Sequence, residues 1–237
     1  MKKLFYIAAV ALLTLGMVSC HKDDDNTNNN TPTNPTNPTT GEWVDLGLPS
    51  GLLWATCNLG ATNPEDYGDY YAWGETSAKE TYNWSTYRYA TVDADGHLQT
   101  LTKYNTSETY GTIDNKTTLE ASDDVATAVL GSGARIPTKA EWQELLDNTT
   151  AEWTTVNNVN GRKFTASNGN SLFLPAAGDR YVSELYLDGT GGLYWSSSLY
   201  ELRPFLAWCM LFDSDYQRVR DYRRYDGFSV RAVRSQN

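Results

Sequence analysis

Apolar and polar residues alternate in short blocks along much of the chain, a pattern typical of small strands joined by loops. Between 43 and 60, two apolar runs flank the turn Pro49-Ser50-Gly51 and predict two paired strands. From 83 to 119 the sequence is polar, rich in Thr and studded with Tyr, which predicts long surface loops with short strands. No internal repeat is visible.

Two segments carry the signals of short helices. Residues 122–131 begin with Ser-Asp-Asp, continue with Val125, Ala128 and Val129, and end in a glycine, which predicts a helix with acids at its positive end. Thr138 and Glu141 form a capping box of the Thr-x-x-Glu type. The helix that this box opens is expected to bury residues at i, i+3 and i+4, which are Trp142, Leu145 and Leu146.

The C-terminal stretch, residues 199–234, mixes two kinds of position. The first kind has the regularity of paired strands and turns, and we call these the frame positions: Ala207, Trp208, Phe212, Ser214, Val219, Arg224, Tyr225 and residues 227–234. The second kind mixes Phe, Leu, Cys, Arg and Asp, and so obeys neither the rule for a core nor that for a solvated face. These fifteen gap positions are Tyr200, Leu202, Arg203, Phe205, Leu206, Cys209, Leu211, Asp213, Tyr216, Arg218, Arg220, Asp221, Tyr222, Arg223 and Asp226.

A codon rule accounts for the residue types at the gap positions. If each once held Asn, encoded by AAC or AAT, and only the adenines were replaced, the resulting codons cannot encode Lys, Glu, Gln, Met or Trp. All fifteen gap residues satisfy this rule, and residues 199–226 hold five Arg and no Lys, whereas the rest of the chain holds eight Lys. The alternative is that the stretch lacks Lys by chance and is an irregular C-terminal sheet.

With Asn restored at the gap positions, the stretch resembles the template repeats of diversity-generating retroelements in gut Bacteroidetes. The targets of those elements are lipoproteins that end in a C-type-lectin-like domain, so the resemblance implies a ligand-binding surface diversified over about residues 199–226. The same rewriting extends upstream through Asp179, Tyr181, Val182, Tyr186, Leu187 and Leu193. Whether diversification reaches that far stays open.

Five motifs in order resemble the Fibrobacter succinogenes major paralogous domain over about residues 43–234. They are residues 64–76, Arg135-Ile136-Pro137-Thr138, Leu174-Pro175-Ala176-Ala177-Gly178, Tyr194-Trp195-Ser196-Ser197 and the terminal Gly-Phe-Ser-Val-Arg. This resemblance implies an α+β fold for residues 42–237, C-type-lectin-like and related to the formylglycine-generating enzymes, with two short helices and small antiparallel sheets.

The N-terminal part of the chain predicts secretion and a membrane anchor. Two lysines precede an apolar run that ends at Cys20, and Met17-Val18-Ser19 resembles a bacterial lipobox. We expect a signal peptide over 1–19, a diacylglyceryl group on Cys20 and a disordered Asn/Thr/Pro tether over 20–41. Residues 21–25 resemble the acidic tag of surface lipoproteins, which implies a lipid-anchored outer-membrane protein exposed at the cell surface. The alternative is a plain secretory signal cut elsewhere.

Charge narrows the choice of partners. The net charge of −10 on 237 residues argues against nucleic acid. Residues 199–237 carry seven Arg and five acids, a net charge of +2, so the rest of the chain carries −12. A basic, aromatic C-terminus therefore belongs to an otherwise acidic protein.

The sequence lacks the residue sets of common catalytic and metal sites. Apart from Cys20 only Cys57 and Cys209 are present, and because Cys209 is a gap position we expect both thiols to be free. The two histidines fall in segments expected to be mobile and supply neither a zinc set nor a Ser-His-Asp triad. Residues 194–198 lack the hard ligands of calcium-dependent lectins. We therefore predict no catalytic residue, no metal and no cofactor.

Together these features predict a surface-displayed ligand-binding lipoprotein that is not an enzyme. Its partner is expected to be a protein or a glycan, and its contact with the membrane only the lipid anchor. One alternative is a fixed-sequence module for glycan binding or adhesion; another, an enzyme of the formylglycine-generating type, lacks its copper-binding cysteine pair. We expect the gap positions to converge on one exposed face with Phe205 and Leu206 exposed, and replacement of Trp208 or Phe212 to be damaging if they are buried.

Overall fold

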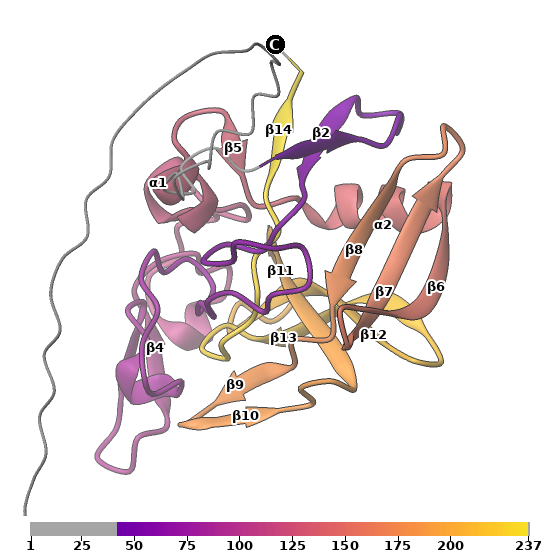
Figure 1. Ribbon diagram of the computed structural model, residues 1–237. Helices are drawn as coiled ribbons and strands as arrows, with labels where there is room; N and C mark the ends of the chain where they lie inside the picture. Colours follow the sequence, from indigo (N-terminus) through magenta and orange to yellow (C-terminus); the bar gives the residue numbers. More distant parts are fainter. Residues whose placement is uncertain (1–41, 237) are drawn as a thin grey trace, which may run out of the picture. The chain divides into compact units, whose positions relative to one another are not determined.

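A three-stranded antiparallel sheet near the C-terminus (Figure 1) lies between two hydrophobic core clusters. It consists of β11 (Gly191–Leu199), β12 (Leu206–Asp213) and β13 (Gln217–Arg223), with β12 in the middle. Because successive residues of a strand face opposite sides, Trp195 and Cys209 belong to one core cluster and Tyr194 and Phe212 to the other. The computed structural model describes residues 42–236, so the predicted signal peptide, Cys20 and the whole tether lie outside the described residues.

The first core cluster is built around indole rings with backbone partners. Trp195 stacks on Phe228 with 4.1 Å between ring centroids, and its Nε1 donates to the carbonyl of Tyr71 at 2.7 Å. The Nε1 of Trp73 donates to the carbonyl of Ser196 at 2.8 Å. Both indoles are fully buried, so they are structural and do not offer a stacking surface for a sugar.

The second core cluster lies against helix α2 (Lys139–Asn148) and the meander β6 (Thr149–Val156), β7 (Val159–Ala166) and β8 (Ser171–Pro175). The predicted capping box is present: Thr138 Oγ1 accepts from the Glu141 N–H, and the Glu141 carboxylate accepts from the Thr138 N–H. Trp142 and Leu145 are buried as predicted, whereas Leu146 is half-buried.

The other predicted helix is α1 (Val125–Leu130), preceded by a 3-10 turn at Ala121–Asp123. The Asp124 carboxylate accepts from the N–H groups of Ala126 and Thr127, and Gly131 ends the helix. Only the first turn is buried; Val129 is exposed, because a helix of this length offers one short apolar face.

The predicted N-terminal strands pair with each other and with the end of the chain. Antiparallel β1 (Trp43–Asp45) and β2 (Leu52–Ala55) join β14 (Val233–Ser235) and β5 (Ala134–Arg135) in the order β1-β2-β14-β5. The two ends of the domain therefore lie in one sheet (Figure 1).

The segment 83–119 is loop-rich, as predicted, with the hairpin β3 (Ala90–Val92) and β4 (Leu98–Leu101) and 3-10 turns at Trp84–Thr86 and Glu108–Tyr110. Its tyrosines are not all at the surface: Tyr87, Tyr89 and Tyr104 are buried in the first core cluster. Their rings pack edge to face and place this segment against the C-terminal sheet.

A final hairpin, β9 (Asp179–Tyr181) and β10 (Glu184–Tyr186), is joined to the C-terminal segment by a bridge between Arg180 and Gly227. With two α-helices and mostly antiparallel strands in small open sheets, the fold is α+β, as predicted.

Candidate functional site

The gap positions lie on β12, on β13 and in the loops around them (Figure 1). Six are exposed, namely Leu202, Arg203, Tyr216, Arg218, Arg220 and Arg223. Five are half-buried, namely Tyr200, Phe205, Asp213, Asp221 and Tyr222, and four are buried, namely Leu206, Cys209, Leu211 and Asp226. Most of the set therefore reaches solvent.

Most frame positions are buried, among them Ala207, Phe212, Tyr225, Phe228, Val230 and Arg231. Ser214 is the exposed frame position, and Trp208, Val219 and Arg234 are half-buried. The neighbours Arg223 and Arg224 show the contrast most directly: the gap residue is exposed, whereas the frame residue has no exposed surface. Replacement of Trp208 or Phe212 is expected to be damaging if these residues are buried. Phe212 is buried, whereas Trp208 is only half-buried.

Arg224 ties the end of β13 to the long loops. Its guanidinium donates to Tyr87 Oη at 2.8 Å and to the carbonyls of Pro204 at 2.8 Å, Lys103 at 3.0 Å and Tyr104 at 3.1 Å. Three of these partners belong to the segment 83–119, and the fourth, Pro204, lies in the loop of residues 200–205 that carries several gap positions. One frame residue therefore fixes the backbone of this loop against the segment 83–119.

Three gap residues, Arg218, Arg220 and Tyr222, stand on one face of β13, an edge strand. Arg218 pairs with Leu211 and Arg220 with Cys209, so alternate gap residues of the two strands share a face, as their spacing predicts. The guanidinium of Arg218 lies 4.9 Å from the Tyr216 ring, and that of Arg220 lies 5.5 Å from the Tyr222 ring. Within residues 42–236 neither guanidinium forms an ion pair.

The expectation of a single exposed face is wrong. Cys209 and Leu211 are on the same face as Arg218 and Arg220, but on the central strand, where the first core cluster covers them. Asp221, which pairs with Trp208, points to the opposite side of the sheet. Neighbouring residues of a strand cannot share a face, so the adjacent gap positions Arg220 and Asp221 must divide between the two sides.

The expected exposure of Phe205 and Leu206 is also wrong. Leu206 is only 8% exposed, because it lies inside a tight loop whose backbone bonds join Leu206 to Arg203 and Tyr200 to Leu206. Phe205 is half-buried against Tyr110, with 5.5 Å between ring centroids. The apolar residues of this loop therefore hold it in place, and Leu202 is the exposed apolar residue at its tip.

Two carboxyl groups and a thiol lie close enough to influence one another electrostatically where the C-terminal segment meets the β9–β10 hairpin. Burial raises the pKa of Asp226 to about 7 and that of Asp179 to about 6, although Arg223, whose Nε is 3.3 Å from Asp226 Oδ2, opposes both shifts. Asp226 Oδ1 has no hydrogen-bond partner among the described residues. Burial, followed by the charge of Asp221, raises the pKa of the Cys209 thiol well above its usual value. Both Cys209 and Cys57 are free, as predicted.

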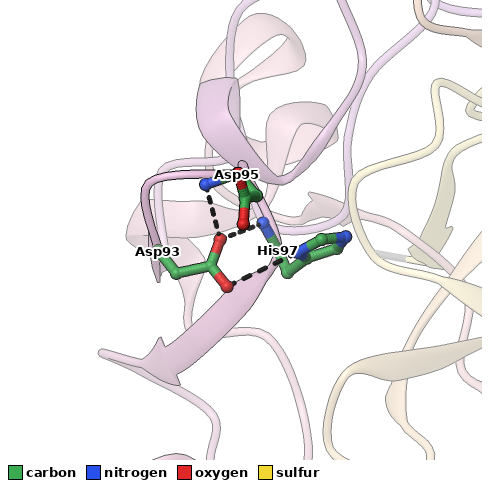
Figure 2. A group of neighbouring side chains, drawn as sticks. All are labelled: Asp93, Asp95 and His97. Carbon is green, nitrogen blue, oxygen red and sulfur yellow. Dashed lines mark hydrogen bonds and ion pairs between the residues drawn. The ribbon is translucent and has the colours of Figure 1, made fainter.

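Figure 2 shows a group that the sequence analysis did not single out, Asp93, Asp95 and His97 in the turn between β3 and β4. Asp93 Oδ1 accepts from the backbone N–H groups of Asp95 at 3.0 Å and His97 at 2.8 Å. The bond from His97 comes first among the causes that lower the pKa of Asp93. All three residues are exposed, and the hydrogen bonds of the turn account for their proximity. His97, expected in a mobile segment, therefore lies in a hydrogen-bonded hairpin.

Two cavities of the described domain lie away from the gap positions. One of about 460 Å³ beside α1 and β5 is lined by residues that include Leu119, Asp124 and Arg135. Here Asp124 caps α1 and Arg135 forms an ion pair with Glu141, so both charges already have structural partners. The other, of about 470 Å³, has charged residues in its lining, namely Asp69, Lys79, Glu80 and Arg180, none of which is a gap position.

No family model, curated protein or solved structure matches this chain. Within residues 42–236 none of the helices has the length and apolar character needed to cross a membrane. Function must therefore be inferred from the residues and their geometry.

Replacing buried frame residues should destabilise the protein far more than replacing exposed gap residues. Phe212→Ala should lower the free energy of unfolding by about 3–5 kcal/mol because it leaves a cavity, and Arg224→Ser by roughly 3 kcal/mol because it leaves four acceptors without a donor. Arg220→Ser and Tyr216→Ser should change it by about 0.5 kcal/mol or less. Denaturant unfolding of Arg224→Ser and Arg220→Ser is the matched comparison. Equal losses of unfolding free energy in these two variants would contradict the division into frame and gap positions.

Asp226 should make the stability depend on pH. Because its pKa rises from 3.8 to about 7 on folding, the native state holds more protons between these values, and the free energy of unfolding falls as the pH rises through that window. Asp226→Asn removes this titration and should be more stable than the parent by roughly 1–3 kcal/mol at pH 8. The advantage should shrink toward pH 4, where the aspartate is protonated. Asp215→Asn, in an exposed turn, is the control; an Asp226→Asn variant that is less stable than the parent at pH 8 would count against the buried charge.

Proposed function

We propose that this chain is a surface lipoprotein whose C-type-lectin-like domain displays a diversified ligand-binding surface and carries out no catalysis. The observation that supports it most is the alternation of environments along residues 199–226, where frame residues are mostly buried and most gap residues reach solvent. Arg223 and Arg224 follow this rule although they are identical neighbours, so their environments follow the pattern of positions and not the residue type.

The α+β architecture agrees with a lectin-like scaffold. Small antiparallel sheets and two short helices are what the resemblance to the paralogous domain implies, and its motifs occupy structural positions. Tyr194 and Trp195 are buried on opposite faces of β11, and Arg231 bonds to the carbonyls of Ala55 and Thr56. These motifs therefore support the fold and leave binding to the gap positions.

The exposed gap residues are of the kinds that bind proteins. Tyr216 and the arginines of β13, together with the half-buried Tyr222, combine aromatic area with guanidinium donors, the side chains that concentrate binding energy at protein interfaces. Arg218 and Arg220 have no ion-pair partner within the described residues, so their donors are free for a ligand. We infer a protein partner ahead of a glycan.

A fixed-sequence glycan-binding or adhesion module is the second candidate. The cavity lined by Asp69, Lys79, Glu80 and Arg180 favours it, because it offers several charged groups at positions outside the gap set. Under this alternative the gap residues would be free to carry any codon.

The anchor completes the proposal. Cys20 would carry the lipid and the following tether would hold the domain away from the outer membrane, with no other membrane contact and no nucleic-acid partner. These residues lie outside residues 42–236, so this part is carried by the sequence alone.

The gene's codons test the proposal. Tyr, Phe, Cys and Asp codons end in a pyrimidine under any origin, so the decisive gap positions are Leu202, Arg203, Leu206, Leu211, Arg218, Arg220 and Arg223. Adenine replacement in Asn codons predicts CTC or CTT for each Leu and CGC or CGT for each Arg. Sequencing the gene measures this directly, with the leucines and arginines outside residues 179–226 as the control set. Codons that end in A or G at the decisive positions would rule out this origin.

A further inference from the structure

The β9–β10 hairpin and its exit expose apolar and aromatic side chains. Within residues 42–236 seven large hydrophobic residues are exposed, and four of them are Tyr181, Val182, Tyr186 and Leu187 of this hairpin and its exit. Two others, Leu202 and Tyr216, are gap positions. Clustered exposure of this kind marks a binding surface in a soluble domain.

Two residues of the hairpin and its exit have a backbone conformation that their side chains disfavour. Val182 and Leu187 have φ angles of 56° and 60°, in the left-handed region. A β-branched residue there is an outlier, whereas Asn tolerates that region because its side chain can bond to the local backbone. Three of the other four non-glycine residues with positive φ are Asn115, Asn157 and Asn158. Asn at positions 182 and 187 would remove the conflict.

The hairpin is continuous with the gap residues of β13. The Arg223 guanidinium lies 4.9 Å from the Tyr181 ring, and Tyr181 lies 6.3 Å from Tyr186. Asp179, which is on the same face of β9 as Tyr181, is near enough to Tyr222 and Cys209 to contribute to their electrostatic environment. A ligand resting on β13 would therefore also meet the hairpin.

We propose that Asp179, Tyr181, Val182, Tyr186 and Leu187 are diversified by the same replacement of Asn codons, so that hairpin and β13 form one binding surface for a protein that presents carboxylates. This inference rests on the proposed function. It extends the binding site upstream of residue 199 and adds a second structural element to it.

The charge of this surface and the number of its residues indicate that its ligand is an acidic protein. Arg218 and Arg220 stand on the shared surface without an ion pair within the described domain, and their charges call for carboxylates on the partner. A standard protein interface takes about 20–30 residues from each side, and the hairpin brings the gap set closer to that number than β13 and its loops alone. A small sugar would leave most of these positions without contact.

Measurements of stability test whether Val182 and Leu187 stand where the backbone favours Asn. Val182→Asn and Leu187→Asn should each raise the Tm by about 2–4 °C, because Asn relieves the strained φ. Tyr186→Asn, at a neighbouring exposed position without a positive φ, should not raise the Tm.

The codons of the hairpin give a second test. Val182 should be encoded by GTC or GTT and Leu187 by CTC or CTT. If these two codons end in a purine while the decisive codons of residues 199–226 end in pyrimidines, this inference fails and the proposed function stands; purines in both sets overturn both.

A display selection tests the shared binding surface. In the full chain the five hairpin positions and the fifteen gap positions would be randomised, and clones selected separately on calmodulin, an acidic protein, and on dextran. We expect binders to calmodulin that are enriched in Arg at gap positions and that lose about tenfold in affinity, equal to about 1.4 kcal/mol, when the hairpin positions revert to Asn. Reversion of the fifteen gap positions is the matched arm. If only reversion of the gap positions lowers the affinity for calmodulin, the hairpin's role is overturned but the proposed function is not. If the selection yields binders to dextran alone, or no binders, the protein-binding surface is overturned.

Discussion

The buried guanidinium of Arg224 is the constraint on which the C-terminal surface depends. It holds carbonyl groups from the loop before β12 and from the segment 103–104, and it bonds to the Tyr87 hydroxyl, without exposing any of its own surface. A guanidinium buried with four neutral acceptors is stable only while all of them stay in place. The backbone around the gap positions is therefore fixed by a residue that is not one of them.

This arrangement separates folding from display, but not completely. On β13 the exposed gap residues can change with little effect on the interior. Cys209 and Leu211 belong to the first core cluster, and Asp226 is buried with only Arg223 as an ion-pair partner. Charged residues at such positions lower stability because burial disfavours the charge. Under the proposed diversification, fewer residue types would be tolerated at these buried positions than at the exposed ones, and Asp226 shows that an ionisable residue can occupy one of them.

The sequence predicted features that depend on local chemistry. The capping box at Thr138, the acids before α1 and the strand pair around Pro49-Ser50-Gly51 are set by residues close in the chain, and the structure contains all three. Features that depend on distant partners were missed. Tyr87 and Tyr104 are buried only because Arg224 and Trp73 reach them from elsewhere in the chain, and Leu206 is covered because its loop closes on itself. The positive φ of Val182 and Leu187 is likewise a property of the backbone, which no residue pattern shows.

The central claim is that residues 199–226 combine a constant frame with side chains that are replaced from copy to copy of the gene. Deep sequencing of this gene from many cells of the population that carries it measures the claim most directly. The account predicts amino-acid replacements concentrated at the fifteen gap positions, confined to the first two bases of their codons, with Phe212, Arg224 and the other frame residues unchanged. Replacements spread evenly over frame and gap positions, or absent from both, would contradict it.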